Sequence, residues 1–270
     1  ALIIQQFIDT VRAKHKTGNA TEHSYRPALE ALFAAVMPGI SVINEPTALV
    51  DVGAPDFSFS AKGIAIGWCE AKDLPIDLAK LKDANADQKR RYLEALPNQI
   101  YTNGLDWEFY KDGDKIRSVS IGVLTGGKIE TLPDHFDTLL NQLKSFAAET
   151  PQSITSAKKL AQMMAGKAVL IKDIMGNTLR KDADLNTELT NQFKAFRAHL
   201  IHDIDADEFA DVYAETIAYG LFAARLHDPS QGSFDRREAL DLLPKSNPFL
   251  RSLFGYIAGV DLDDRIAWVI

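Results

Sequence analysis

The sequence predicts an α/β fold, in which a mixed β-sheet flanked by helices is followed by an all-α region. Within the first 150 residues the apolar positions change from helical spacing to alternation and back, and beyond residue 151 every periodic segment has helical spacing. A chain of 270 residues is long enough for about two domains. We therefore expect an α/β domain over residues 1–150 and a helical domain over residues 151–270.

Two helices are expected first, over residues 2–16 and 25–37, because their apolar residues lie three and four positions apart. From residue 40 onward short runs alternate between apolar and polar residues, as half-buried strands do. Asp112-Gly113 separates the last two runs and is a strong hairpin turn signal. The expected strands cover residues 40–45, 56–60, 64–72, 98–102, 105–110 and 115–124.

Helical spacing returns between these strands and after them. A helix is expected over residues 83–96, where Pro97 would stop it, and another over residues 135–148. Residues 149–153 have the composition of a linker. The remaining expected helices cover residues 157–174, 185–201, 206–226, 234–243 and 249–257.

Composition and charge restrict the class of protein. With 46% hydrophobic and 25% charged residues and no apolar run near the roughly 20 residues that cross a bilayer, we expect a cytoplasmic protein with no membrane partner. The single cysteine, Cys69, excludes an internal disulfide and a cysteine-rich zinc site. A net charge of −7 makes binding to nucleic acid through bulk charge poor, so a nucleic-acid function must depend on a local site.

Two adjacent expected strands carry charged residues among apolar ones. Asp56 begins one strand, and Glu70 and Lys72 end the next. If residues 61–63 form a three-residue loop, Asp56 lies opposite Trp68, and Asp56 and Glu70 are diagonal neighbours on one face, about 7–8 Å apart. A two-residue loop would place the two carboxylates on opposite faces of the sheet.

Two carboxylates this close repel each other and call for a cation between them. Hard oxygen ligands suit Mg²⁺, for which Mn²⁺ can substitute, and the backbone carbonyl of Ala71 is available as a third ligand. Such an ion polarises a phosphoryl oxygen and activates water, while Lys72 orients that water or neutralises developing charge, so hydrolysis of a phosphodiester is predicted. The structural alternative is a surface ion pair between Glu70 and Lys72 on an edge strand, with Asp56 merely starting a strand.

The helix expected over residues 83–96 carries Gln88 and Tyr92 four residues apart on one face. Between them lie Lys89, Arg90 and Arg91, which are either a solvated helix face or, if Gln88 and Tyr92 face the metal, contacts to DNA phosphates.

These stretches in this order resemble the PD-(D/E)XK nuclease superfamily, including the QxxxY helix of its RecB-like and Mrr-like branches. Residues 20–125 also resemble the N-terminal nuclease region of single-chain restriction–modification enzymes of type IIG and type ISP, which fuse a nuclease to an adenine-N6 DNA methyltransferase. The resemblance implies a restriction-endonuclease-like core and double-stranded DNA as the substrate. The stretches that carry it are Pro55-Asp56, Glu70-Ala71-Lys72 and Gln88-Lys89-Arg90-Arg91-Tyr92.

The resemblance also implies roles for individual residues. Glu22 matches the acidic residue that the family places near the metal on its first helix, and Glu30 is the competing choice because Pro27 blurs the start of that helix. The implied catalytic residues, of which the first two would be metal ligands, are Asp56, Glu70, Lys72, Gln88 and Tyr92.

The chain departs from those enzymes because it has neither a methyltransferase motif nor a target recognition domain. We expect it to be a fragment in which residues 151–270 are the connector preceding the methyltransferase, so S-adenosylmethionine would bind only to parts outside this sequence. Expected partners are those missing domains and a second copy that meets the first transiently for double-strand cleavage. The alternatives are a catalytically silent nuclease-fold module that binds DNA or acts as a scaffold, and a stand-alone RecB-like repair nuclease.

Two other patterns favour structural explanations. Residues 122–128 have the spacing of a phosphate-binding P-loop, but Ile129 stands where Ser or Thr is needed, which predicts a strand end and a turn. The acidic and histidine residues at 199–208 are explained by a helix end followed by a new helix with Asp205 as its N-cap.

Overall fold

The computed structural model describes residues 1–44, 54–61, 64–148, 157–185, 187–227, 236–242, 251, 254–255, 262, 264–267 and 269. Its backbone divides into two compact units. Unit 1 comprises Ala1–Val50 and Pro55–Ile154, and unit 2 comprises Asp51–Ala54 and Thr155–Ile270. The linker expected at residues 149–153 lies outside the described residues.

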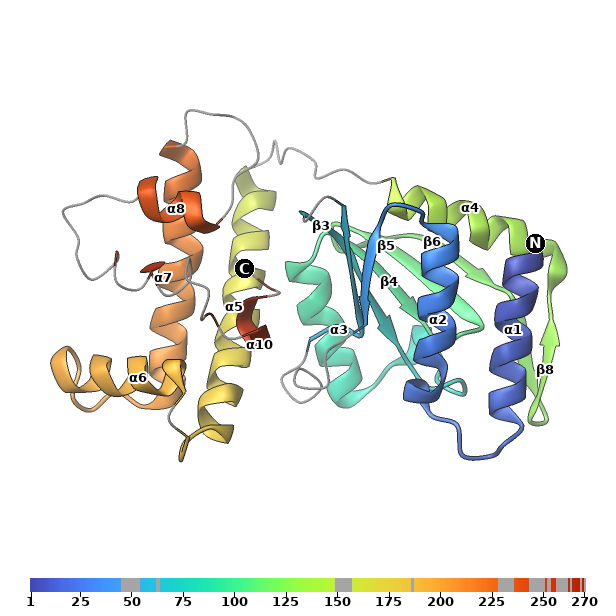
Figure 1. Cartoon of the computed structure of the whole chain (residues 1–270), viewed down its shortest axis with the longest axis horizontal. Coiled ribbons are helices and arrows are strands. Elements are labelled where there is room, and N and C mark those ends of the chain that lie inside the picture. Colours follow the sequence, from blue (N-terminus) through green and yellow to red (C-terminus); the bar gives the residue numbers. More distant parts are fainter. Residues whose placement is uncertain are drawn as a thin grey trace. The chain divides into compact units, whose positions relative to one another are not determined.

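The mixed sheet predicted from the sequence is confirmed in unit 1, where six strands lie in chain order from β1 to β6 (Figure 1). Neighbouring strands are antiparallel except β3 and β4, which are parallel. Parallel neighbours need a crossover connection, and helix α3 lies in it. The strands are β1 (Ser41–Asn44), β2 (Phe57–Ala61), β3 (Ile64–Ala71), β4 (Asn98–Thr102), β5 (Asp106–Lys111) and β6 (Asp114–Ser120).

Helices cover both faces of this sheet. Three of them, α1, α2 and α4, pack their apolar sides on one face and form the main core with it (Figure 1). Helix α3 lies against the opposite face, where the Gln99 side chain donates hydrogen bonds to the Tyr92 and Leu96 carbonyls, both at 2.7 Å. The helices are α1 (Leu2–His15), α2 (Glu22–Val36), α3 (Asp83–Ala95) and α4 (Phe136–Ala147), with 3₁₀ turns η1 (Leu78–Lys80) and η2 (Pro133–His135).

Strand alternation explains why the two faces differ. In β5, Trp107 and Phe109 enter the main core, whereas Glu108 and Tyr110 point toward α3. Phe33 of α2 lies at the centre of that core and makes edge-to-face ring contacts with β2 and β5 aromatics at 5.0–6.1 Å. The main core therefore lies on the face that α1, α2 and α4 cover, and the polar side chains Gln99 and Glu108 lie on the α3 side.

The run expected over residues 115–124 is two strands rather than one. Strand β6 ends at Ser120, and β7 (Gly122–Thr125) pairs with β8 (Lys128–Thr131) in a separate two-stranded sheet. The β7–β8 turn is Gly126-Gly127, with φ of 55° and 76°. The P-loop-like stretch thus forms a strand and a turn, as predicted. Asp112-Gly113, with φ of 51° and 86°, likewise forms the predicted β5–β6 turn.

The predicted register of β2 and β3 is wrong, although the expected placement of Asp56 and Glu70 on the same face of the sheet is retained. Ser58, not Asp56, lies opposite Trp68, and Ala61 pairs with Ile64, while loop residues 62–63 lie outside the described residues. The register shifts between Phe59 and Ser60, where β3 contains one extra residue. This bulge compensates for the closer pairing at the loop end, because one extra residue reverses the side to which the following side chains point.

Gly67 of β3 lies where the Phe146 ring of α4 packs on the sheet. A Cβ at this position would overlap the ring, which also contacts Phe59 at 5.1 Å. We expect Gly67→Ala to lower the free energy of unfolding by about 1–3 kcal/mol, because the buried ring has to move. Urea unfolding should show this loss, and Phe146→Leu in the Gly67→Ala background should cost less than Phe146→Leu alone. Equal costs of Phe146→Leu in both backgrounds would contradict this steric explanation.

Every secondary-structure element described in unit 2 is a helix, as predicted, but the first of these helices is longer than expected. Helix α5 continues through Gly176-Asn177, because Met175 and Leu179 on either side of that pair are buried and their packing outweighs the low helix propensity of glycine. The helices are α5 (Ala157–Lys181), α6 (Glu188–His199), α7 (Ala206–His227), α8 (Arg236–Leu242) and α10 (Asp264–Ala267). The helix expected at 234–243 is confirmed as α8, whereas most of the helix expected at 249–257 lies outside the described residues.

The predicted cap of α7 is confirmed, because Asp205 Oδ1 accepts a hydrogen bond from the Glu208 N–H at 2.8 Å. The Glu208 side chain in turn accepts one from the Asp205 N–H at 3.1 Å. Within the described ranges, no helix combines the length and hydropathy of a membrane span.

Candidate active site

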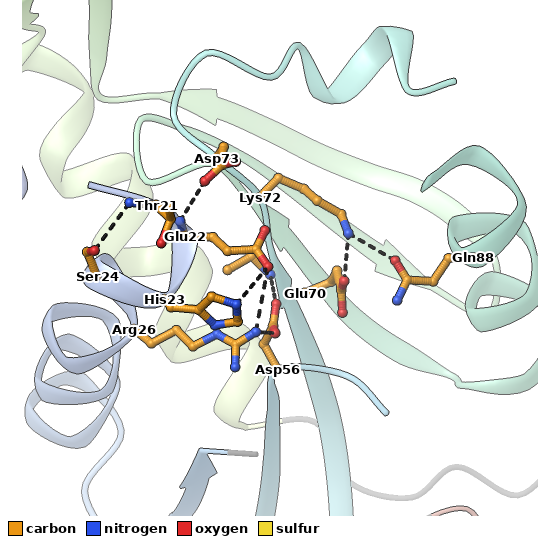
Figure 2. A network of polar contacts seen from close by, with 11 residues as sticks. Thr21, Glu22, His23, Ser24, Arg26, Asp56, Glu70, Lys72, Asp73 and Gln88 are labelled. Carbon is orange, nitrogen blue, oxygen red and sulfur yellow. Dashed lines mark hydrogen bonds and ion pairs between the residues drawn. The ribbon is translucent and has the colours of Figure 1, made fainter. Parts of the chain in front are cut away.

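The candidate site lies where the ends of β2 and β3 approach the first turn of α2 (Figure 2). Asp56 immediately precedes β2, and its Oδ2 accepts a hydrogen bond of 2.6 Å from the Ala71 N–H at the end of β3. Glu70 belongs to β3, and both carboxylates are buried, with exposed fractions of 3% for Asp56 and 5% for Glu70. Antiparallel pairing of β2 with β3 brings the two acids into one place.

Lys72 joins these acids to helix α3. Its Nζ donates hydrogen bonds to Glu70 Oε1 at 2.7 Å and to Gln88 Oε1 at 2.9 Å (Figure 2). Gln88 Nε2 in turn lies 3.3 Å from the Tyr92 hydroxyl. The sheet and α3 therefore bring together the five residues that the sequence predicted as catalytic.

The alternative of a surface ion pair on an edge strand does not fit this arrangement. Strand β3 lies inside the sheet, between β2 and β4. Lys72 is only 6% exposed, so the Glu70–Lys72 pair is buried. Burying an ion pair costs desolvation free energy that a simple strand end does not require, which favours a functional role.

Helix α2 begins earlier than the sequence indicated. Thr21 is its N-cap, and Thr21 and Ser24 form a reciprocal capping box, so Pro27 lies within the second turn instead of at the start. The Glu22 N–H donates a hydrogen bond of 2.6 Å to Asp73 Oδ1, just beyond Lys72. This bond ties the first turn of α2 to the end of β3.

Because α2 starts early, the structure distinguishes between Glu22 and Glu30 as the acidic residue that the resemblance places near the metal. Glu22 lies on the first turn, beside the site, and its pKa is raised first by burial and next by the Asp56 carboxylate. Glu30 is exposed and accepts a hydrogen bond of 3.3 Å from Asn44 of β1. The structure thus brings Glu22, and not Glu30, toward Asp56.

Arg26 and Asp73 are site residues that the sequence analysis missed. The Arg26 guanidinium forms a buried ion pair with Asp56, and its Nη2 lies 3.7 Å from Glu22 Oε1 (Figure 2). The signal available in the sequence was the spacing of Glu22 and Arg26, which at i and i+4 share one helix face. That spacing alone does not show that a strand end would supply the third partner.

The three acids of the site have raised pKa values, first of all because they are buried. Burial, and next the Asp56 carboxylate, raises the pKa of Glu70 to about 8. Burial also raises the pKa of Asp56, although the Arg26 guanidinium opposes this, and burial and then Asp56 raise the pKa of Glu22. Three carboxyl groups thus share a region with two cations, Arg26 and Lys72, and an additional positive charge would stabilise their ionised forms.

The donor set fits a hard divalent cation. Among the described atoms, Glu70 Oε2 is buried without a hydrogen-bond donor, so this oxygen is available as a ligand. No group of three or more His, Cys, Asp or Glu side chains within the described residues is close enough to hold one ion. Two carboxylates and the Ala71 carbonyl would therefore be the protein ligands, and the metal role of Glu22 stays a prediction.

The basic run of α3 does not form one DNA-facing surface, which corrects the interpretation of Lys89. Lys89 Nζ donates to Glu108 Oε2 at 2.7 Å and lies 4.8 and 5.0 Å from the ring centroids of Tyr101 and Tyr110. Because these partners belong to the sheet, Lys89 anchors α3 and does not reach outward. Arg90 is exposed and pairs with Glu94 at 3.4 Å, and Arg91 is half-buried.

Glu108 is the centre of this anchor. Burial alone would raise its pKa, but hydrogen bonds from Lys89, Tyr110 and Lys115 hold the pKa below its ordinary value. We expect Glu108→Gln to lower the free energy of unfolding by roughly 1–3 kcal/mol, because it leaves Lys89 without its carboxylate. The matched control Glu94→Gln removes only an exposed pair and should change stability by less than about 0.5 kcal/mol. Equal effects in chemical denaturation would contradict the anchoring role.

Comparisons of the chain with protein families, curated proteins and solved structures do not identify a family. No protein-family model matches the chain, and no curated protein matches it. Among solved structures, the chain is similar to the cryo-EM structure of a DrdV–DNA complex, with 16% sequence identity and a TM-score of 0.42. The match covers 100% of this chain and 27% of that chain. A similarity at this level does not decide function.

Proposed function

We propose that unit 1 is a divalent-metal-dependent endonuclease that hydrolyses phosphodiester bonds in double-stranded DNA. The observation that carries this proposal is the buried cluster of Asp56, Glu70 and Lys72 at the ends of the interior strands β2 and β3, with Gln88 hydrogen-bonded to the lysine. Buried acids with raised pKa values beside an amine are typical of sites that bind metal ions or transfer protons. Burying such charged groups costs desolvation free energy, which a purely structural role does not require.

Asp56, Glu70 and the Ala71 carbonyl would hold the metal, which we propose to be Mg²⁺ with Mn²⁺ as a substitute. When bound, such an ion polarises a phosphoryl oxygen and lowers the pKa of water. The hydrogen bond from the Ala71 N–H fixes Asp56, while the ammonium of Lys72 fixes one oxygen of Glu70 and leaves the other for the ion. Both carboxylates are thereby oriented before substrate binds.

The protein side chains supply the remaining requirements of the reaction. Lys72 Nζ carries a positive charge next to the proposed ligands, where it can orient the attacking water or offset negative charge that develops on the phosphate. Gln88 holds the amine from the α3 side, and Tyr92 lies beside Gln88. These two residues position Lys72 and are not expected to form bonds with the phosphate.

The choice of DNA follows from the resemblance of residues 20–125 to restriction–modification nucleases. We extend the proposal to a chain whose complete form carries an adenine-N6 methyltransferase that binds S-adenosylmethionine and a target recognition domain. A second copy would then supply the cut in the other strand. Arg90 is the exposed member of the basic run available for phosphate contacts.

Nicking of supercoiled plasmid by the 270-residue chain tests the proposal. We expect open-circle product with Mg²⁺ or Mn²⁺, and none with EDTA, because cleavage depends on a metal held by carboxylates. Mn²⁺ binding should be measured on the same sample by electron paramagnetic resonance. Absence of both nicking and Mn²⁺ binding would refute the nuclease, whereas DNA binding without metal binding would favour the silent module.

A further inference from the structure

Arg26 occupies an unusual place for a guanidinium. It is only 8% exposed, pairs with Asp56, and has its Nη2 3.7 Å from Glu22 Oε1. Taking a charged guanidinium out of water is costly unless carboxylates compensate. Here the compensating carboxylates are a proposed metal ligand and the acid beside it. Arg26 is therefore the cation in direct contact with Asp56, while Lys72 also acts on both acids through its charge.

The fold holds this guanidinium in position from both sides. Glu22 and Arg26 lie one turn apart on α2, and the bond from the Glu22 N–H to Asp73 fixes that turn against the end of β3. Asp56 is fixed through its other oxygen by the Ala71 N–H. Asp56 Oδ1 is thus the oxygen that Arg26 holds, and it is also an oxygen that a metal ion would use.

We infer that Arg26 competes with the divalent cation for Asp56 and is a positioning residue that keeps the acids in place until metal binds. This inference rests on the metal-dependent function proposed above. Both Asp56 oxygens already accept hydrogen bonds, Oδ2 from the Ala71 N–H and Oδ1 from Arg26, whereas Glu70 keeps one oxygen without a donor among the described atoms. A metal ion that takes Oδ1 of Asp56 would therefore have to displace Arg26 from it, and repulsion between the two positive charges favours that displacement. The released guanidinium remains on α2 beside the site, with the planar donor geometry that suits a phosphate.

A purely structural role for the same ion pair makes a different prediction. If Arg26 only anchored α2 to the sheet, its removal would loosen the site and weaken metal binding or leave it unchanged. Competition predicts the opposite sign, since removing the resident charge frees Asp56. Metal affinity therefore distinguishes the two roles, whereas loss of activity or of stability does not.

The experiment measures Mn²⁺ affinity of the 270-residue chain in alkaline buffer, where the carboxylates are ionised. Arg26→Met should bind Mn²⁺ about tenfold more tightly than the unaltered protein, the order of effect expected when a neighbouring like charge is removed. Its metal-free melting temperature should fall, and the deficit should shrink in saturating Mn²⁺. Arg26→Lys retains a charge and should stay within about threefold of the unaltered affinity. Arg12→Met on α1, whose side chain pairs with Asp9 and reaches the Ile129 carbonyl at 3.5 Å, is the matched control for metal affinity and should leave that affinity unchanged.

A second measurement does not require the methionine variant to fold. Diamagnetic Mg²⁺ should shift the Nε–Hε nuclear magnetic resonance signal of Arg26, identified by its loss in Arg26→Lys, if the metal displaces the guanidinium. Unchanged or weaker Mn²⁺ binding by Arg26→Met, or an Arg26 signal that Mg²⁺ does not move although it binds, would overturn the competition while leaving the nuclease proposal intact. Failure of every variant and the unaltered chain to bind Mn²⁺ would overturn both.

Discussion

Lys72→Met should reduce metal-dependent plasmid nicking by at least about 10³-fold while the protein stays folded. Methionine preserves most of the side-chain volume but removes the ammonium that contacts Glu70 Oε1 at 2.7 Å and Gln88 Oε1 at 2.9 Å. The carboxyl of Glu70 can take up a proton in this variant, so the fold does not have to keep an unpaired buried charge. Initial nicking rates and far-ultraviolet circular dichroism, measured on the same preparation, check both parts.

Lys128→Met is the matched control for this experiment. Lys128 is exposed at the β7–β8 turn, so the same substitution there should leave nicking unchanged. Undiminished cleavage by Lys72→Met would remove the amine from the reaction and with it the proposed catalytic role of the cluster. Equal losses in both lysine variants would indicate a general effect of charge.

The metal-free protein should lose stability as the pH rises, and Glu70 should be a major cause. The pKa of Glu70 is raised from an ordinary value of 4.5 to about 8, first by burial and then by Asp56. The folded state therefore binds this proton more tightly than the unfolded state. Its contribution to stability is complete below about pH 4.5 and disappears as the pH rises through about 8. The expected loss is on the order of a few kcal/mol.

Glu70→Gln tests this assignment because glutamine does not titrate. The difference in the free energy of unfolding between the unaltered protein and Glu70→Gln, from urea titrations in EDTA, should change steadily across that range. Mg²⁺ should stabilise the unaltered protein more at the alkaline end, where the ionised carboxylate is available. A pH-independent difference would show that Glu70 is not the group responsible, and Glu94→Gln, on the exposed side of α3, should give such a flat difference.

Local sequence patterns were sufficient for most of the fold and for the composition of the candidate site. Alternation placed strands close to all six positions of the main sheet, because one face of each central strand packs against α1, α2 and α4. Helical spacing of Gln88 and Tyr92 indicated their common face on α3, and the structure places Gln88 against Lys72. The metal and the DNA substrate stay predictions, since these patterns identify ligands and not what they bind.

The errors of the sequence analysis share one cause, which is that the relevant partners are distant in the chain. The extra residue in β3 changes the register only through pairing with β2, and the outcome depends on which backbone groups meet. Lys89 belongs to a charged run that is typical of a solvated face, yet Glu108 and two tyrosine rings from the sheet hold it. The sequence analysis expected Gly176 to end a helix, but α5 continues through it because the neighbouring residues are buried in unit 2.

Residue types and their spacing thus establish an α/β unit with two acids, a lysine and a helix amide, because these properties depend on periods of two and of 3.6 residues along the chain. Folding adds the side-chain environments: Arg26 is paired with Asp56, Glu70 is buried with one free oxygen among the described atoms, and Glu22 rather than Glu30 lies at the site. The charge around a side chain and its burial depend on all the segments that pack near it, and these segments are distant in the sequence. The local spacing of residues along the chain therefore does not determine them.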